Sequence, residues 1–123
     1  MVSLKRWLPA ILLCLFIFAS SATPGAQVST NQDVDFLAHK SIHVVIYSML
    51  FLALFRATKH SPLAVVLAIL YGASDEVHQT FVPSRVGSVR DFLIDSGAVL
   101  VTAGILWKYS YLLPTKLKNW LSE

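Results

Sequence analysis

This sequence contains little charge and only one cysteine. Charged residues make up 14% of its 123 positions, against roughly 25% in an ordinary soluble domain. The single cysteine, Cys14, excludes an internal disulfide and any zinc or iron–sulfur site built from cysteines of this chain. The formal charge of +3 is small and the basic residues form no continuous run, so we expect no nucleic-acid partner. No motif recurs at a fixed period, and the length is that of a single domain, residues 1–123.

Apolar residues dominate instead. They account for 55% of the chain, and the mean hydropathy is +0.63. A helix needs about 20 mostly apolar residues to cross a bilayer, and four segments come close to this length: 7–22, 36–55, 62–82 and 91–107. Short turns at 56–61 and 83–88 join the last three segments. The sequence therefore predicts an all-α fold, an integral membrane bundle of four transmembrane helices.

Residues typical of helix ends lie at three of these boundaries. Ser61 followed by Pro62 predicts an N-cap and a first-turn proline for the third helix. Pro83 is expected to end that helix, because proline has no N–H to continue the hydrogen-bond pattern. Ser88, with Asp91 three residues later, resembles a capping box at the start of the fourth helix.

The first segment also fits a secretory signal peptide. Residues 1–6 are basic, residues 8–18 are apolar, and small residues at 20–22 resemble a cleavage site. Cleavage would leave three transmembrane helices. The loop that follows the segment, residues 23–33, is exported in either case.

The distribution of lysine and arginine predicts the orientation. With the N-terminus in the cytoplasm, the inner side carries most of the basic residues: Lys5, Arg6, Arg56, Lys59, Lys108, Lys116 and Lys118. The outer side then carries Lys40, Arg85 and Arg90. This asymmetry follows the positive-inside rule and predicts that both termini are cytoplasmic.

Ionisable residues inside the predicted spans are the unusual feature of this sequence. A charged side chain in the bilayer is costly, so each one marks a candidate functional site by default. The third segment begins apolar and then carries a polar group over its outer turns: Asp75, Glu76, His78 and Gln79. The second segment carries His39, Lys40, His43 and Tyr47 within about 100° of one another around the helix.

The fourth segment has a polar face at the same depth. Asp91 and Asp95 are four residues apart and share one side of the helix. Arg85 and Arg90 lie on or beside the preceding turn. Because polar faces in a bilayer can be satisfied only by one another, we expect the three helices to converge here.

Acid–base or nucleophilic chemistry on a lipid head group or lipid-linked sugar is one use of such a cluster. Glu76 or Asp75 would be the general base, with His78 or His43 as its partner. Arg85 would hold an anionic group, since a guanidinium matches phosphate oxygens. The expected binding surface also includes Gln79, Asp91, Asp95, Lys40 and Tyr47. Whether the protein is an enzyme stays open.

Three alternatives stand beside this hypothesis. His39, His43 and His78 with a carboxylate would suit Zn²⁺ or Mn²⁺, although an i, i+4 histidine pair alone is weak support and we assign no metal or cofactor. Acids and histidines also form proton or ion paths, but four short helices are little material for a transporter unless the chain oligomerises. Finally, the acidic residues could have a purely structural role, in which they pair with Arg85, Arg90 and Lys40 and hold the helices together, as in a structural or accessory subunit.

Residues 71–100 resemble the signature of the VanZ-like family of small bacterial membrane proteins. The family pattern has an acidic residue, then Glu-x-x-Gln, then Phe, Pro-x-Arg, Asp, Asn or Asp, and Gly. This chain matches it with Asp75-Glu76-Val77-His78-Gln79, Phe81, Pro83-Ser84-Arg85, Asp91, Asp95 and Gly97. Lys40, His43 and Tyr47 match the family's second helix, and the resemblance covers about residues 36–107.

The resemblance implies a four-helix protein of the bacterial cytoplasmic membrane and cell envelope. The founding member of the family is associated with reduced susceptibility to teicoplanin, a glycopeptide antibiotic that carries an acyl chain. The implied partner is a membrane lipid or a lipid-linked or acylated ligand. This chain has Ser84 where many relatives have glycine, and serine adopts positive φ less readily.

Overall fold

The computed structural model describes residues 3–23 and 29–123. These residues form helices and no strand: α1 (Leu4–Ala22), α2 (Gln32–Thr58), α3 (Ser61–Gln79), α4 (Val89–Tyr109), the 3₁₀ turn η1 (Ser110–Leu112) and α5 (Thr115–Ser122). The prediction of an all-α fold is confirmed for this part of the chain. The predicted basic start and the exported loop fall partly outside it, at residues 1–2 and 24–28.

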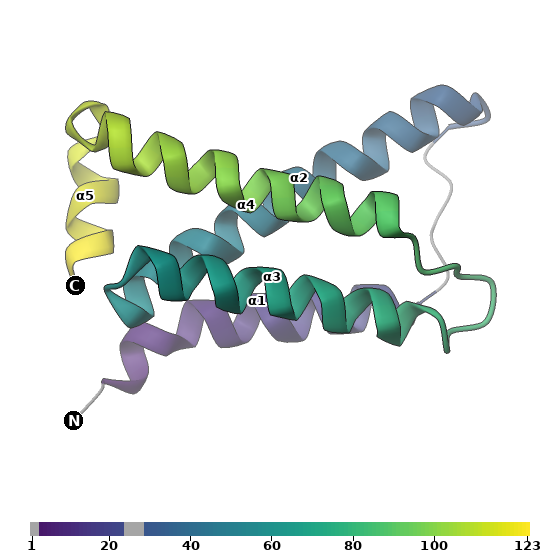
Figure 1. The fold of residues 1–123 in the computed structure, drawn as a ribbon, viewed down its shortest axis with the longest axis horizontal. Coiled ribbons are helices and arrows are strands. Elements are labelled where there is room, and N and C mark those ends of the chain that lie inside the picture. Colours follow the sequence, from purple (N-terminus) through teal and green to yellow (C-terminus); the bar gives the residue numbers. More distant parts are fainter. Residues whose placement is uncertain (1–2, 24–28) are drawn as a thin grey trace.

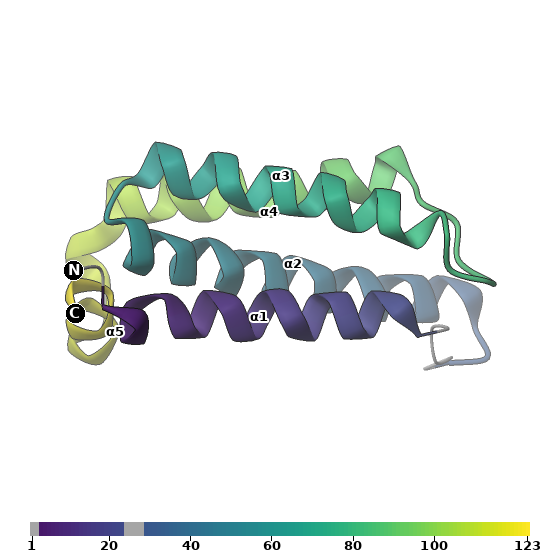
Figure 2. The same ribbon diagram turned by 90° about the horizontal axis from the view of Figure 1, so that it is seen from below.

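The four long helices alternate in direction along one axis (Figures 1 and 2). We call the end that holds the first turns of α2 and α4 the polar end, because Lys40, Asp75 and Asp91 lie near it. The opposite end, with the N-terminus and α5, is the basic end. In Figure 1 α2 lies diagonally across the other helices, and it packs against α1, α3, α4 and α5.

Small residues let these helices pack closely. Ala53, Ala64 and Ala68 are almost completely buried, together with the large side chains of Leu50, Phe51, Tyr47 and Val99. A Cβ atom on Gly72 would lie 3.3 Å from Cε1 of Tyr47, so glycine permits the close approach of α3 to α2. Interfaces rich in small residues are typical of helices that pack within a bilayer.

Two helices, α1 and α2, are long and apolar enough to cross a membrane. α3 and α4 have sufficient length, but polar residues in their first or last turns lower their hydropathy. Both still expose large apolar side chains: Leu70, Leu93, Leu100, Val101 and Ile105 are at least half exposed. Such contiguous apolar surface is rare on soluble monomers. That α3 and α4 also cross the membrane, which would give four spans, is therefore a proposal.

The helix ends correct several sequence predictions. α2 begins at Gln32 rather than 36, because the Asn31 side chain accepts hydrogen bonds from the backbone N–H groups of residues 33 and 34. The N-cap of α3 is His60 and not Ser61: its Nδ1 accepts from Leu63 N at 3.2 Å. α3 ends at Gln79, before Pro83, because residues 80–85 form tight turns with Ser84 at φ 67°.

The predicted capping box of α4 is also wrong. Ser88 is the N-cap as expected, but its side chain makes no capping hydrogen bond. Its backbone N–H donates instead to Oε2 of Glu76, at 2.8 Å. Asp91 is engaged elsewhere, in an ion pair with Lys40.

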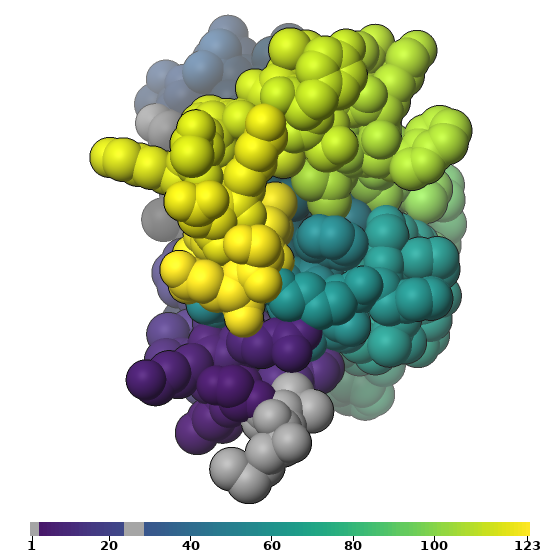
Figure 3. Space-filling model, turned by 90° about the vertical axis from the view of Figure 1, so that its left-hand side faces the viewer, coloured from purple at the N-terminus to yellow at the C-terminus, as the bar shows by residue number. Residues whose placement is uncertain are grey.

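The short helix α5 was not predicted, and it lies across the basic end of the bundle (Figure 3). Arg56, buried at the end of α2, holds it there. Its guanidinium donates to Trp120 O at 2.8 Å and to Lys5 O at 3.0 Å, and it pairs with Glu123 at 3.3 Å. Arg6 donates to the carbonyl oxygen of residue 57 at 3.1 Å. One end of α2 is therefore linked to both chain ends.

Candidate functional site

A buried hydrogen-bond network links α1, α2 and α3 near the polar end. Oη of Tyr47 donates to Oδ2 of Asp75 at 3.3 Å. Nε2 of Gln79, one turn further along α3, donates to the same oxygen at 3.1 Å and lies 3.4 Å from Oγ of Ser21. All four side chains are buried. Ser21 was not singled out in the sequence, because a serine near the end of an apolar helix gives no signal of its own.

A second set of polar contacts joins α2 to α4. Lys40 Nζ lies 2.6 Å from Oδ2 of Asp91. One turn deeper, Nδ1 of His43 lies 3.4 Å from both carboxylate oxygens of Asp95, whose side chain is 2% exposed. The imidazole of His43 also stacks near the Tyr47 ring, with 6.3 Å between centroids. His43 and Tyr47 therefore connect this set of contacts with the Asp75 network.

Glu76 lies on α3 and faces the loop before α4. Its Oε2 accepts the backbone N–H of Ser88, which fixes the first turn of α4 relative to the last turns of α3. Its other oxygen, like Oδ1 of Asp75 and Oδ1 of Asp95, is buried without a hydrogen-bond partner in the described part of the chain. Buried polar atoms of this kind are uncommon. Three buried carboxylates therefore lie at this end of the bundle with oxygens that could accept further hydrogen bonds.

The two remaining histidines of the polar end, His78 and His39, make other contacts. The His78 ring stacks on Phe18 of α1, with 4.5 Å between centroids, and so packs against α1 rather than with His43. His39 is bonded locally: its Nδ1 lies 2.8 Å from the carbonyl oxygen of Asp35, one turn earlier. His39 nevertheless lines the same cavity as His43. In residues 3–23 and 29–123, no three His, Cys, Asp or Glu side chains are grouped to hold a metal.

The two arginines of the α3–α4 turn have distinct partners. Arg85 donates from Nε to Thr23 O at 2.9 Å and from Nη2 to Ser20 O at 3.1 Å. These are carbonyl groups at the C-terminus of α1, where a positive charge is favourable. Its Nη1 group has no hydrogen-bond partner in the described residues. Arg90 lies over the ring of Phe36, 4.6 Å from the centroid.

A cavity opens between α1 and α2 beside these groups. Its volume is about 160 Å³, which is room for a small polar group and not for a whole amphiphile. Apolar side chains from both helices form part of its wall, and the polar part consists of Ser20, Ser21, His39, His43, Tyr47 and Arg85. The cavity therefore has a cation at its side and two side chains that can hydrogen-bond a ligand, His43 and Tyr47, in its wall. We call it the polar-end cavity.

Comparison with known proteins gives one match. A family model described as VanZ/LLP1 matches residues 6–113, nearly the whole chain, and confirms the resemblance found in the sequence. No curated protein and no solved structure matches the chain. Together with the two apolar helices, the family match indicates a membrane protein.

Proposed function

Because this chain belongs to the VanZ/LLP1 family, we propose that it binds the polar head of an amphiphile in the polar-end cavity. The candidate ligands are a lipid-linked envelope precursor and an acylated glycopeptide such as teicoplanin, since both join a polar head to an acyl chain. The observation that supports this function is the cavity itself. It is lined by Arg85, by Tyr47, whose hydroxyl donates to the buried Asp75, and by His43, which lies 3.4 Å from the buried Asp95.

The proposed placement is a multi-pass protein of the bacterial cytoplasmic membrane with both termini inside. Seven of the basic side chains belong to the basic end, including Arg56, Lys59 and Lys118, and three belong to the polar end. The positive-inside rule then directs the basic end to the cytoplasm. The polar-end cavity consequently faces the outer leaflet, where lipid-linked precursors are used and where an antibiotic arrives.

In this proposal each polar side chain has a distinct role. The free Nη1 of Arg85 binds an anionic group of the ligand. His43, paired with Asp95, exchanges a proton with the bound head group, and Tyr47 offers a hydroxyl held by Asp75. Glu76 acts indirectly, because its bond to Ser88 N positions the loop that carries Arg85.

The test is susceptibility to teicoplanin, with vancomycin as the control, in a Gram-positive host that expresses the protein at matched membrane levels. We expect wild type to protect against teicoplanin only. Ser20→Trp, which fills the cavity, and Arg85→Gln should each abolish protection. Arg90→Gln is the matched control, because Arg90 lies in the first turn of α4, close to the same loop, but does not line the cavity. Absence of protection by wild type would reject the acylated glycopeptide as the ligand.

The competing role is a structural subunit whose charges only join helices. Here replacement of Glu76 and Arg85 together by Met and Leu would preserve function at equal membrane abundance, and neither single replacement would reduce it. That result would overturn the binding proposal. Loss of protection in both single variants, with normal abundance and helicity, would support it.

A further inference from the structure

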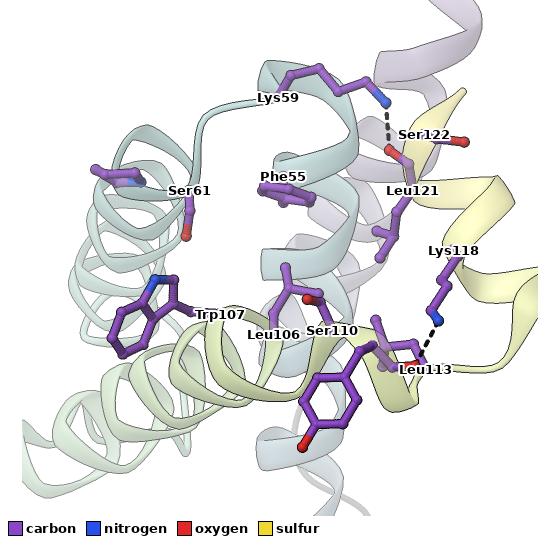
Figure 4. Close-up of a pocket in the computed structure, with 12 residues that line it drawn as sticks. Phe55, Lys59, Ser61, Leu106, Trp107, Ser110, Leu113, Lys118, Leu121 and Ser122 are labelled. Atoms are coloured by element: carbon purple, nitrogen blue, oxygen red, sulfur yellow. Dashed lines mark hydrogen bonds between the residues drawn. The ribbon is translucent and has the colours of Figure 1, made fainter.

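A larger pocket lies at the basic end, opposite the polar-end cavity. Its volume is about 860 Å³, within the range of roughly 300–1,000 Å³ that is typical of small-molecule sites. It lies between the end of α2, the start of α3, the end of α4 and α5 (Figure 4). Phe55, Leu106 and Leu121 surround its interior, so its floor is apolar.

Two lysines provide the charge of this pocket. Lys59 Nζ donates to Leu121 O, and Lys118 Nζ donates to Tyr111 O at 2.7 Å. An ammonium group has three donors, so each lysine keeps two for a ligand. No carboxylate is among the described residues that line the pocket. A ligand here therefore meets two ammonium groups above an apolar floor, with the nearby Glu123 carboxylate outside the lining and paired with Arg56.

The local electrostatics also favour an anion. Desolvation and the nearby guanidinium groups of Arg6 and Arg56 lower the pKa of Lys59, and the Glu123 carboxylate only partly opposes them. A like-charge cluster of this kind is relieved when a negative group binds. Arg56 is already occupied by Glu123 and backbone carbonyls, so Lys59 is the member of the cluster that faces the pocket.

Aromatic side chains place the rim of the pocket at a membrane surface. Trp107 is 86% exposed and Tyr111 is 66% exposed. Such rings prefer the head-group layer of a bilayer. With the rim at that depth, the floor formed by Phe55 and Leu106 lies at the depth of the acyl chains.

We propose that this basic-end pocket binds an anionic phospholipid of the surrounding membrane. The phosphate binds Lys59 and Lys118, and an acyl chain lies along Phe55 and Leu106. Basic pockets between helices on the cytoplasmic side of membrane proteins bind anionic lipid heads in this way. The inference depends on the proposed membrane placement but not on the polar-end cavity or its ligand.

Native mass spectrometry of the full chain tests the proposal. The protein is extracted from vesicles of equal phosphatidylcholine and phosphatidylglycerol, and the retained lipid is identified. A basic side chain at a membrane surface contributes severalfold to the affinity for an anionic lipid, so we expect roughly a tenfold preference for phosphatidylglycerol. The double variant Lys59→Gln, Lys118→Gln should lose this preference. Lys116 lies on α5 like Lys118 but outside the pocket, so Lys116→Gln should keep the preference for phosphatidylglycerol.

A second variant separates lipid binding from folding of α5. Ser110→Phe fills the pocket without changing charge, and it should lower retention of phosphatidylglycerol while circular dichroism stays unchanged. Glycerol 3-phosphate should not displace the lipid, because it has no acyl chain. Equal retention of the two lipids by wild type, or an unchanged preference in the double variant, would overturn the proposal. Ser20→Trp at the opposite end should keep the preference, so failure of the two proposals is distinguishable.

Discussion

Asp75 shows how a carboxylate is held inside this bundle without a cation. Tyr47 and Gln79 both donate to Oδ2, whereas Oδ1 has no partner in the described residues. A carboxylate buried with neutral donors alone is costly, and each of these donors lowers that cost. The position of the group depends on both donors, one from α2 and one from α3.

Removal of the tyrosine donor should therefore be measurable. Tyr47→Phe preserves the ring but takes one hydrogen bond from Asp75, and we expect a loss of about 0.5–1.5 kcal/mol because Oδ2 loses one of its two donors and keeps Gln79. The measurement is denaturant unfolding in a fixed detergent, followed by circular dichroism. Tyr109→Phe, on an exposed ring, is the control and should change stability little. Equal stability of the two variants would contradict the role of Tyr47.

Gly87 is the other residue that the packing requires. A Cβ atom there would lie 2.6 Å from the carbonyl oxygen of Glu76 and 2.7 Å from Cγ2 of Thr80. Gly87→Ala must push the α3–α4 loop away from α3, at a cost of about 1–3 kcal/mol, and it should weaken the bond from Ser88 N to Glu76.

A matched control exists on α4. A Cβ atom on Gly104 would meet no atom within 4 Å, and alanine is the better helix former by roughly 0.5–1 kcal/mol. Gly104→Ala should leave stability unchanged or raise it. The same unfolding measurement compares both variants, and a loss for Gly104→Ala as large as for Gly87→Ala would show that the loop contact is not the cause.

At the scale of the element, α5 depends on contacts with the end of α2. Eight residues are too few for a stable isolated helix, and Arg56 makes the largest set of these contacts, through its bonds to Trp120 O and Glu123, beside the bond from Lys59 to Leu121 O. Arg56→Met should release α5. We expect faster hydrogen exchange of the amides at 115–122, with the long helices protected as before.

Lys108→Met tests whether that effect is specific. Lys108 lies near the same end but contacts only the Tyr109 ring in the described structure. This variant should leave the exchange of α5 unchanged. Equal acceleration in both variants would indicate a general effect of charge at the basic end.

Helical periodicity predicted part of the site and could not predict the rest. It placed His43, Tyr47, Asp75 and Gln79 on faces that do meet, because each pattern was read along one helix. It did not show that His78 packs against α1, since the phase of a helix does not show which neighbour its face contacts. The His78 ring stacks on Phe18 of α1, and Nδ1 of His39 lies within hydrogen-bond distance of the carbonyl oxygen of Asp35, one turn earlier.

Element boundaries show the same limit. The long apolar runs predicted four long helices correctly. They did not predict the polar first turn of α2, because its start depends on the Asn31 cap and not on apolar residues. α5 has too little apolar character to be recognised, and only tertiary contacts with Arg56 reveal why it forms. Ser84, noted as a departure from its relatives, does adopt positive φ.

At the scale of the whole molecule, α1 is part of the site and not only an anchor. It provides Ser20 and Ser21 to the polar-end cavity, and its last carbonyl groups bind Arg85. Loss of residues 1–22 would remove one wall of that cavity. We therefore expect the protein isolated from membranes to retain them, which intact mass measurement checks directly.

Orientation is a second property of the whole molecule that can be measured. In a Cys14→Ala background, Thr30→Cys should react with a membrane-impermeant maleimide in intact cells, because the polar end faces outward in the proposed placement. Ser122→Cys, at the end of α5, should react only after permeabilisation. The opposite labelling pattern would invert the placement, and labelling of both sites in intact cells would contradict the four-span arrangement.

The diagonal course of α2 has a consequence for the membrane as well as for the protein. Its 27 residues extend about 40 Å, whereas the hydrocarbon core is about 30 Å thick. A helix that is too long for its bilayer leans further as the bilayer thins, and α2 forms one wall of the polar-end cavity. In the proposed membrane placement, a change in the lean of α2 would therefore alter the width of that cavity. The affinity of the protein for teicoplanin should differ between vesicles of short-chain and of long-chain phosphatidylcholine. Identical affinity in both would show that the tilt of α2 does not affect the cavity.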